Sequence, residues 1–253
     1  MKMISAEWKK IWFIKPYRIY LILATIASIL IGVVFSLTTR VTQGRPLSEF
    51  EPMQIISINM LGVDIVTIFL LLFIAVQIGR EFQEKTIQSY LSVTPSRTRY
   101  FFAKAAIYFL IALVIGTVVA LATQMTGRFF VSSVHKPMPS PAELWRFTAG
   151  CIVMPVFYAL LTVCATFSAR NTAAGIVAPV FVLFLPALAK LFPKMLQSIT
   201  IPSLPMSAIH TLSGVAEKGS LEYTGVMAAF LVLGSWLVLS AATAIWKFRK
   251  KDI

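Results

Sequence analysis

The chain has 253 residues and a formal net charge of +13 at pH 7, and 58% of its residues are hydrophobic while only 13% are charged. A water-soluble domain of this composition would lack the polar surface needed to cover itself, so the composition excludes that class and indicates a protein solvated by a bilayer. The basic residues lie near helix ends and form no groove-sized patch with interleaved aromatic side chains. Membrane lipids are therefore expected as partners, and nucleic acid is not.

The first 17 residues have the pattern of an amphipathic helix that lies along the membrane surface. Its apolar positions recur at i, i+4, i+7 and i+8, and they are Ile4, Trp8, Ile11 and Trp12. Charged residues, including Glu7, are expected on the other faces. Pro16 disfavours helical geometry at Lys15, which predicts a bend there. A basic flank with tryptophans at the membrane interface is the alternative interpretation.

Six apolar runs are long enough to cross roughly 30 Å of hydrocarbon at about 1.5 Å per residue. They lie near Tyr20–Leu37, Ile55–Ile78, Ala105–Thr126, Leu144–Phe167, Ala173–Phe192 and Thr224–Trp246. We therefore expect an all-α, polytopic membrane protein, with six transmembrane helices that form a single domain over residues 1–253.

The distribution of charge predicts the orientation of these helices. With both termini in the cytoplasm, the cytoplasmic segments hold 15 of the 23 basic residues and 4 of the 10 acidic residues, and thus +11 of the net charge of +13. The basic residues are Lys2, Lys9, Lys10, Lys15, Arg18, Arg80, Lys85, Arg97, Arg99, Lys104, Arg170, Lys247, Arg249, Lys250 and Lys251. The acidic residues are Glu7, Glu81, Glu84 and Asp252. This asymmetry predicts a multi-pass protein with both termini in the cytoplasm.

Two titratable residues are candidates for a substrate path or a gate. Asp64 lies inside the second apolar run, because a helix that began after it would be too short to cross the membrane. A carboxylate at that depth should face the bundle interior or water, where it either contacts substrate or is satisfied by packing and hydration. His210 could sense pH or contact cargo, and the alternative for such a lone histidine is a structural role.

The charged segment 79–104 lies between the second and third apolar runs, on the predicted cytoplasmic side. Glu81 and Lys85 are spaced i, i+4 with the acid first, which favours a helix. The apolar knob on one face of this helix is formed by Ile87, Tyr90 and Leu91. Pro95 is expected to end the helix. The basic residues that follow suit lipid headgroups, and they are Arg97, Arg99 and Lys104. In the alternative interpretation, the knob packs back on the bilayer surface.

Residues 193–223 precede the last apolar run and are themselves fairly apolar. Pro202 and Pro205 interrupt this segment, and a seventh crossing would carry the basic C-terminus outside, against the charge asymmetry. We expect two short helices that enter the outer side of the membrane and return, with a buried face formed by Ile209, Leu212 and Ala216.

These features resemble the permease subunits of type 2 ATP-binding cassette (ABC) exporters. The residues that carry the resemblance are Glu81, Thr86, Leu91, the run Pro95-Ser96-Arg97, and Lys104. Subunits of that family have six spans, an N-terminal amphipathic connecting helix, a coupling helix between spans two and three, and re-entrant elements before the last span. The resemblance therefore covers nearly the whole chain. Lys85 departs from it, because many relatives have glycine before the threonine.

The resemblance implies a permease of the bacterial cell membrane that pairs with a second copy or a paralogue and with two separate ABC ATPase subunits. ATP and Mg would bind those ATPases, whose closure would push the coupling helix. The candidate coupling residues are Glu81, Lys85, Ile87, Tyr90, Leu91 and Arg97. By analogy with such subunits, the exported cargo would be an antimicrobial peptide, a drug or an amphipathic lipid-like compound.

The sequence contains neither a G-x-x-x-x-G-K-[ST] run nor an H-E-x-x-H motif, so this chain is not expected to be an enzyme. Its two histidines, His135 and His210, both fall in predicted outer loops, so no metal or cofactor site is expected in it. Two other functions remain open. An ion-coupled secondary transporter would use carboxylates near the midplane, for which Asp64 is the candidate. A non-transporting scaffold or immunity protein would need neither an ATPase nor a substrate path.

Overall fold

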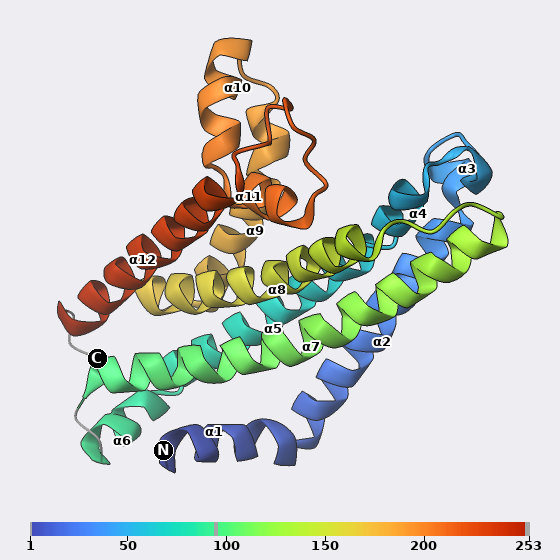
Figure 1. Cartoon of the computed structure of the whole chain (residues 1–253). Coiled ribbons are helices and arrows are strands. Elements are labelled where there is room, and N and C mark those ends of the chain that lie inside the picture. Colours follow the sequence, from blue (N-terminus) through green and yellow to red (C-terminus); the bar gives the residue numbers. More distant parts are fainter. Residues whose placement is uncertain (1, 94–95, 251–253) are drawn as a thin grey trace.

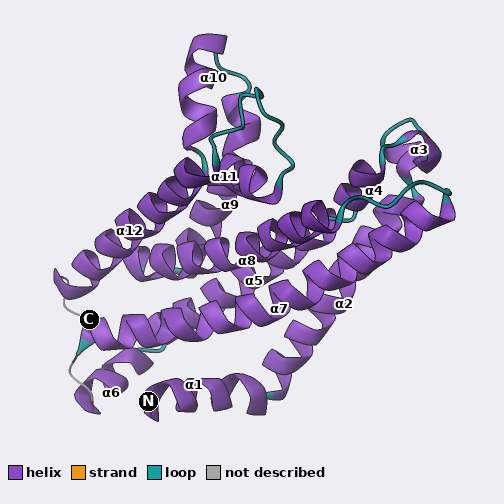
Figure 2. Cartoon of the chain, viewed as in Figure 1, coloured by secondary structure: helices purple, strands orange, loops and turns teal. Residues whose placement is uncertain are grey.

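The computed structural model of the chain describes residues 2–93 and 96–250, without the side chains of residues 2–6, 89 and 91–93. Within these residues the protein is built from helices and loops, and no strand is present (Figure 2). The α-helices are α1 (Lys2–Phe13), α2 (Lys15–Leu37), α3 (Thr39–Thr42), α4 (Pro52–Ile58), α5 (Leu61–Gln83), α6 (Thr86–Val93), α7 (Arg97–Ser133), α8 (Pro141–Ala169), α9 (Thr172–Ala189), α10 (Lys194–Thr200), α11 (Pro205–Ser213) and α12 (Val226–Lys250). Two 3-10 helices, η1 (Leu47–Glu49) and η2 (Ile201–Ser203), complete the described elements.

Six helical stretches are long and apolar enough to cross a membrane, and they coincide with the six apolar runs of the sequence. They are Lys15–Leu37, Pro52–Gln83, Arg97–Ser133, Pro141–Ala169, Thr172–Ala189 and Val226–Lys250. The prediction of an all-α polytopic membrane protein is therefore confirmed. The third stretch is longer than its apolar run, because α7 continues beyond Thr126 to Ser133 and reaches 37 residues, or roughly 55 Å.

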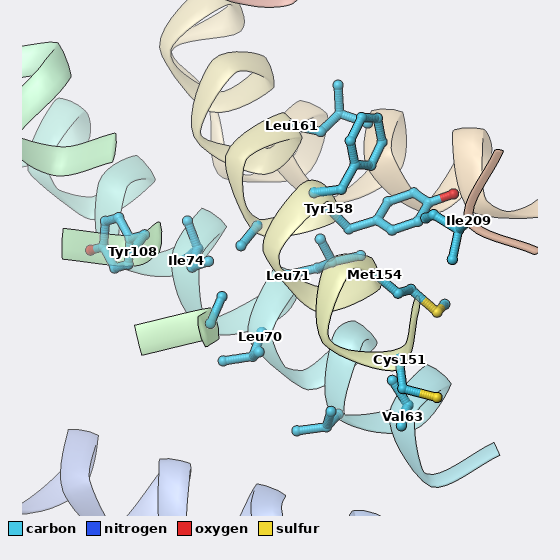
Figure 3. Close-up of a cluster of buried hydrophobic side chains, with 14 of the residues drawn as sticks. Val63, Leu70, Leu71, Ile74, Tyr108, Cys151, Met154, Tyr158, Leu161 and Ile209 are labelled. Atoms are coloured by element: carbon cyan, nitrogen blue, oxygen red, sulfur yellow. The ribbon is translucent and has the colours of Figure 1, made fainter. Parts of the chain in front are cut away.

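The shorter helices lie at two opposite ends of the molecule (Figure 1). We call the end that holds α1, α6 and the C-terminal end of α12 the basal end, and the end that holds α3, α4, α10 and α11 the apical end. The most deeply buried spans are those that contain α5 and α8. Their contact forms the centre of the core, where Val63 and Leu71 of α5 lie near Cys151 and Met154 of α8 (Figure 3).

Small residues let α2 and α5 approach closely. The buried positions of α2 recur every four residues along the helix and include Ala24, Ser28, Gly32 and Ser36. Opposite them, a Cβ atom on Gly62 of α5 would lie 2.7 Å from the carbonyl oxygen of Ser28, a backbone atom that cannot rotate away. This spacing allows the tight packing that is typical of membrane helices, and the sequence analysis did not single it out.

The N-terminal helix meets α2 at a sharp bend, as the proline predicted, but the bend lies one residue earlier than expected. Ile14 is the extended residue (φ −80°, ψ 105°), whereas Lys15 is already helical. Pro16 occupies the first turn of α2, where its missing N–H has no helical acceptor in any case. The chain therefore changes direction at Ile14 and starts the first span at Lys15.

The segment 193–223 contains two short α-helices, α10 and α11, as expected, joined by η2. Ile209 of α11 is fully buried, as predicted. Ala216 is also buried but lies beyond the end of α11, and Leu212 is only partly buried. Arg146 of α8 holds α11 in place, because its guanidinium donates to the last carbonyl groups of that helix, at 2.6 Å to Thr211 O and 3.2 Å to Leu212 O. Entry of this segment into the membrane stays a prediction.

Candidate functional site

A cluster of charged side chains joins three helices at the basal end. Lys104 of α7 places its Nζ atom 2.6 Å from Glu81 Oε1 of α5 and 2.7 Å from Glu7 Oε2 of α1. Lys10 of α1 donates to the same Glu81 Oε1 at 2.8 Å, and the Tyr100 hydroxyl donates to Glu81 Oε2 at 2.7 Å. We call these five residues the basal charge cluster. Glu81 is its centre, since three donors converge on its carboxylate.

The cluster is buried and balanced in charge. Glu7 and Glu81 are 3% and 4% exposed, and Lys104 is completely buried. Two carboxylates face two ammonium groups, so the burial of each charge is offset by a partner in hydrogen-bond contact. Burial alone would lower the pKa of Lys10, but the Glu81 carboxylate outweighs it and the pKa of Lys10 is raised. Lys10 therefore stays charged at neutral pH.

Two of these residues lie where the sequence analysis did not expect them. Glu7 was assigned to an outer face of the N-terminal helix and Lys104 to lipid headgroups, and both assignments are wrong. The spacing of the residues could have predicted the burial of Glu7. It follows Ile4 by three residues and precedes Ile11 by four, which places all three on one helical face. Lys104 likewise shares the buried face of α7 with Tyr100 and Tyr108.

The connection between α5 and α6 is a sharp break rather than a continuous helix. α5 ends at Gln83, and Lys85 adopts φ 55°, the left-handed region that favours glycine. The predicted i, i+4 pair between Glu81 and Lys85 is therefore wrong, because that spacing brings side chains together only within one helix. Lys85 occupies the position where the resemblance placed glycine, and its backbone has the conformation that glycine adopts most easily.

The predicted apolar knob lies on α6 and is split between the core and the surface. Ile87 is completely buried, whereas Tyr90 is 40% exposed and its ring lies 6.0 Å from that of Tyr100. The side chain of Leu91 and the residue Pro95 lie outside the described part of the structure. The Thr86 hydroxyl donates to the Glu81 carbonyl at 3.2 Å and ties the start of α6 to the last turn of α5.

Arg97 contacts the last helix. Its guanidinium donates to the carbonyl oxygens of Phe248 at 3.0 Å and Arg249 at 3.2 Å, at the C-terminal end of α12, where a cation is favourable for the helix dipole. Arg249 in turn donates to the Thr98 hydroxyl at 2.8 Å. Arg97 thus connects the start of α7 to α12, and its described hydrogen bonds do not reach the basal charge cluster.

An aromatic cluster lies beside these contacts and joins four helices. Phe167 of α8 is its centre, with ring centroids at 5.2 Å from Phe101 and Phe248 and at 5.5 Å from Phe82. Tyr100 contacts the same ring at 6.1 Å. These side chains come from α5, α7, α8 and α12, so closely packed rings join the basal ends of four helices.

The N-terminal helix contacts the bundle through Ile11, which is 3% exposed. Trp8 and Trp12 are 37% and 44% exposed, and their rings lie 5.9 Å apart. The expected single apolar face is thus divided into a part that packs on the protein and a part that faces outward. The side chain of Ile4 lies outside the described part of the structure.

The structure brings Asp64 and His210 close enough to interact electrostatically, although they belong to α5 and α11. Asp64 lies in the first turn of α5, and its buried Oδ1 atom lacks a hydrogen-bond partner among the described residues. The Tyr158 hydroxyl, also buried and without a described partner, belongs to the same region; its ring points toward Ile209 of α11 (Figure 3).

His210 also contacts the loop 214–225. Its Nδ1 atom lies 2.8 Å from Glu222 Oε2, and Lys190 Nζ lies 3.4 Å from Glu222 Oε1. The hydrogen bond with His210 lowers the pKa of Glu222 to about 2. Glu222 is therefore ionised and fastens the loop 214–225 to α11. Among the residues that the structure describes, no group of three or more His, Cys, Asp or Glu side chains is placed to hold a metal ion.

The comparisons with known proteins agree with this architecture. No curated protein matches the chain. The family model described as "ABC-2 family transporter protein" matches residues 3–186, which include nearly all of α1, the basal charge cluster, the first four spans and most of the fifth. Because the match covers well over half of the sequence, the chain belongs to the ABC-2 family of transporter proteins.

Proposed function

We propose that this protein is the membrane-spanning permease of an ATP-driven exporter, and that its basal end receives mechanical work from separate ABC ATPase subunits. The basal charge cluster carries the proposal, because it ties the junction of α5 and α6 to α1 and α7 through buried ion pairs. A force applied to α6 would therefore move several helices together. ABC-2 permeases are membrane transport components that pair with an ATP-binding subunit, and the chain itself is not the catalytic part.

The docking surface that we propose is the exposed side of α6. Tyr90 offers a large, partly exposed aromatic side chain, which is typical of residues that dominate protein interfaces. Ile87 anchors the same helix in the core, so pressure on Tyr90 would be passed inward. Lys85 is exposed at the sharp turn before α6 and would set the angle at which that helix meets the ATPase.

The full exporter would contain two such permeases, identical or paralogous, and two ATPase subunits that bind ATP and Mg. The concentration of basic residues near the basal end supports a cytoplasmic position for that end and for both termini, in the bacterial cell membrane. An antimicrobial peptide, a drug or an amphipathic lipid-like molecule is the proposed cargo. Asp64 and His210, which lie near each other toward the apical end, are the proposed contacts on its path.

Co-purification with the co-expressed ABC ATPase, and the ATPase turnover of the complex, test this proposal. Tyr90→Ala should reduce the recovery of ATPase about tenfold, as expected for the loss of an aromatic interface residue. Phe192→Ala is the matched control, because Phe192 is an exposed aromatic residue between α9 and α10, and α10 lies at the opposite end of the molecule from α6 (Figure 1). Glu81→Gln should leave the ATPase bound but abolish its stimulation by the permease. Full binding and full stimulation in both variants would overturn the proposal.

Asp64, whose buried Oδ1 atom has no hydrogen-bond partner among the described residues, favours one other candidate, an ion-coupled secondary transporter. Transport measurements in vesicles that contain this chain without an ATPase distinguish the two functions. Under an imposed proton or sodium gradient, a secondary transporter accumulates cargo and an ABC permease does not. Gradient-driven uptake that disappears in Asp64→Asn would decide for the alternative.

A further inference from the structure

An apolar hollow of about 210 Å³ lies in the corner between α1, α2 and α7, near the basal end. Trp8 and Trp12 line it from α1, and Arg18 lines it at the start of α2. The bend at Ile14 creates this corner, because it turns α1 away from the axis of α2 (Figure 1). The five residues of the basal charge cluster are not among the residues that line this hollow.

The side chains that line the hollow change from charged to apolar along α2. Arg18 is followed on the same helix by Ile22 and Ile26, which are 49% and 50% exposed, and Val114 of α7 faces them at 52%. The rise from Arg18 to Ile26 is about 12 Å, enough to accompany part of an acyl chain. Because the protein spans a membrane, these apolar side chains are in contact with lipid rather than water.

The mouth of the hollow is positively charged. Lys15 is exposed and stands three residues before Arg18, on the same face of α2, and Lys9 stands three residues before Trp12 on α1. The nearest acid of α1, Glu7, is buried in its ion pair with Lys104. No acidic side chain in the described part of the chain forms an ion pair with Lys9, Lys15 or Arg18. Indole rings at this level are typical of the membrane interface, between headgroups and chains.

We propose that this corner binds one anionic phospholipid of the adjoining leaflet, with its headgroup phosphate on Lys15 and Arg18 and one acyl chain along Ile22, Ile26 and Val114. The order of groups along the hollow, first cationic, then indole, then aliphatic, matches the order of groups in such a lipid. The bound lipid fills the angle between α1 and α2. It thereby holds α1, with Glu7 and Lys10, in position for the basal charge cluster.

Quenching of tryptophan fluorescence by brominated lipid tests the site. A protein with Trp145→Phe, Trp236→Phe and Trp246→Phe retains only Trp8 and Trp12 and is reconstituted in dibrominated phosphatidylcholine. Unbrominated phosphatidylglycerol or unbrominated phosphatidylcholine is then added. Phosphatidylglycerol should restore fluorescence at about a fivefold lower mole fraction, as expected for a basic side chain near an anionic headgroup.

Arg18→Gln and Lys15→Gln should each reduce this preference, and Arg18→Lys should retain it. Arg99→Gln is the matched control, because Arg99 is exposed at the same end but outside the hollow, and it should leave the preference unchanged. Gel filtration of each variant confirms folding. Equal restoration by both lipids, or a preference that survives in Arg18→Gln and Lys15→Gln, overturns the proposal. Absence of quenching by brominated lipid also overturns it, since protein would then cover the corner.

Discussion

Lys104 is completely buried, and its ammonium group lies within 2.7 Å of both Glu7 and Glu81. Lys104→Met keeps the volume of the side chain but leaves two carboxylates close together with one fewer cation. We expect it to lower the free energy of unfolding by about 3 kcal/mol, because removal of one partner leaves a buried charge uncompensated. Unfolding of the detergent-solubilised protein in denaturant measures this loss.

Arg99→Met is the control for that substitution, since Arg99 is exposed on the same helix; its effect should stay within about 0.5 kcal/mol. The double variant Lys104→Met with Glu81→Gln should lose less stability than the sum of the two single variants, because the residues share one ion pair. Additive losses would show that Lys104 and Glu81 do not stabilise each other.

Lys85 has the backbone conformation that glycine prefers, with φ 55°. Lys85→Gly should therefore raise the free energy of unfolding by about 1 kcal/mol through relief of the left-handed strain, partly offset by the greater entropy of glycine in the unfolded chain. Lys85→Ala removes the same charge but keeps the Cβ atom. Comparison of the two variants therefore distinguishes the effect of backbone strain on stability from the effect of the lost charge. A Lys85→Gly variant no more stable than Lys85→Ala would contradict the strain argument.

At the contact between α2 and α5, close approach of two helix backbones depends on Gly62. A Cβ atom at this position would lie 2.7 Å from a backbone oxygen of α2, so Gly62→Ala must push the helices apart. We expect a loss of about 1–3 kcal/mol, the usual cost of overpacking, measured by denaturant unfolding in detergent. Gly234→Ala in α12 is the matched control, because a Cβ there meets nothing within 4 Å. Equal stability of the two variants would mean that α2 can move away without cost.

The loop 214–225 is fastened to α11 by the contact between the Glu222 carboxylate and His210, and the strength of this contact depends on pH. The pKa of Glu222 is lowered from 4.5 to about 2, so the folded state favours the ionised carboxylate. Its contribution to stability is complete above pH 4.5 and is lost as the pH falls from 4.5 toward 2. The difference in thermal midpoint between the unsubstituted protein and Glu222→Gln should therefore shrink over this range.

Glu217→Gln provides the comparison for that titration, because Glu217 is exposed in the same loop and takes no part in the contacts of His210 and Lys190. Its thermal midpoint should follow that of the unsubstituted protein at every pH. A constant difference between Glu222→Gln and the unsubstituted protein from pH 6 to pH 2 would refute the role assigned to Glu222.

For the whole molecule, an orientation with both termini in the cytoplasm puts the basal and apical ends on opposite sides of the membrane. Gln88→Cys in α6 and Ser220→Cys in the apical loop are both at exposed positions. A membrane-impermeant thiol reagent applied to intact cells should label Ser220→Cys at once and Gln88→Cys only after permeabilisation. The native Cys151 and Cys164 are buried and should give little background in the unsubstituted protein. Labelling of Gln88→Cys in intact cells would contradict this orientation and place the basal end outside the cell.

The number and position of the spans could be predicted from the amino-acid sequence, because hydrophobicity and charge are properties of each short segment taken alone. The bend before the first span and the two short apical helices followed from proline positions for the same reason. The role of α6 in coupling and the cargo path through Asp64 remain proposals.

The pairing of the charged residues could not be predicted in this way. Lys10 and Glu81 are 71 positions apart, and the choice of Glu81 over nearer partners depends on how α1, α5 and α7 converge at the basal end. Lys85 followed the helix-forming pattern of its neighbours, yet the direction that α6 takes imposes a left-handed turn on it. The hydrophobicity and charge of each segment therefore identify which segments enter the bilayer. The packing of the helices against one another decides which residues distant in sequence come into contact.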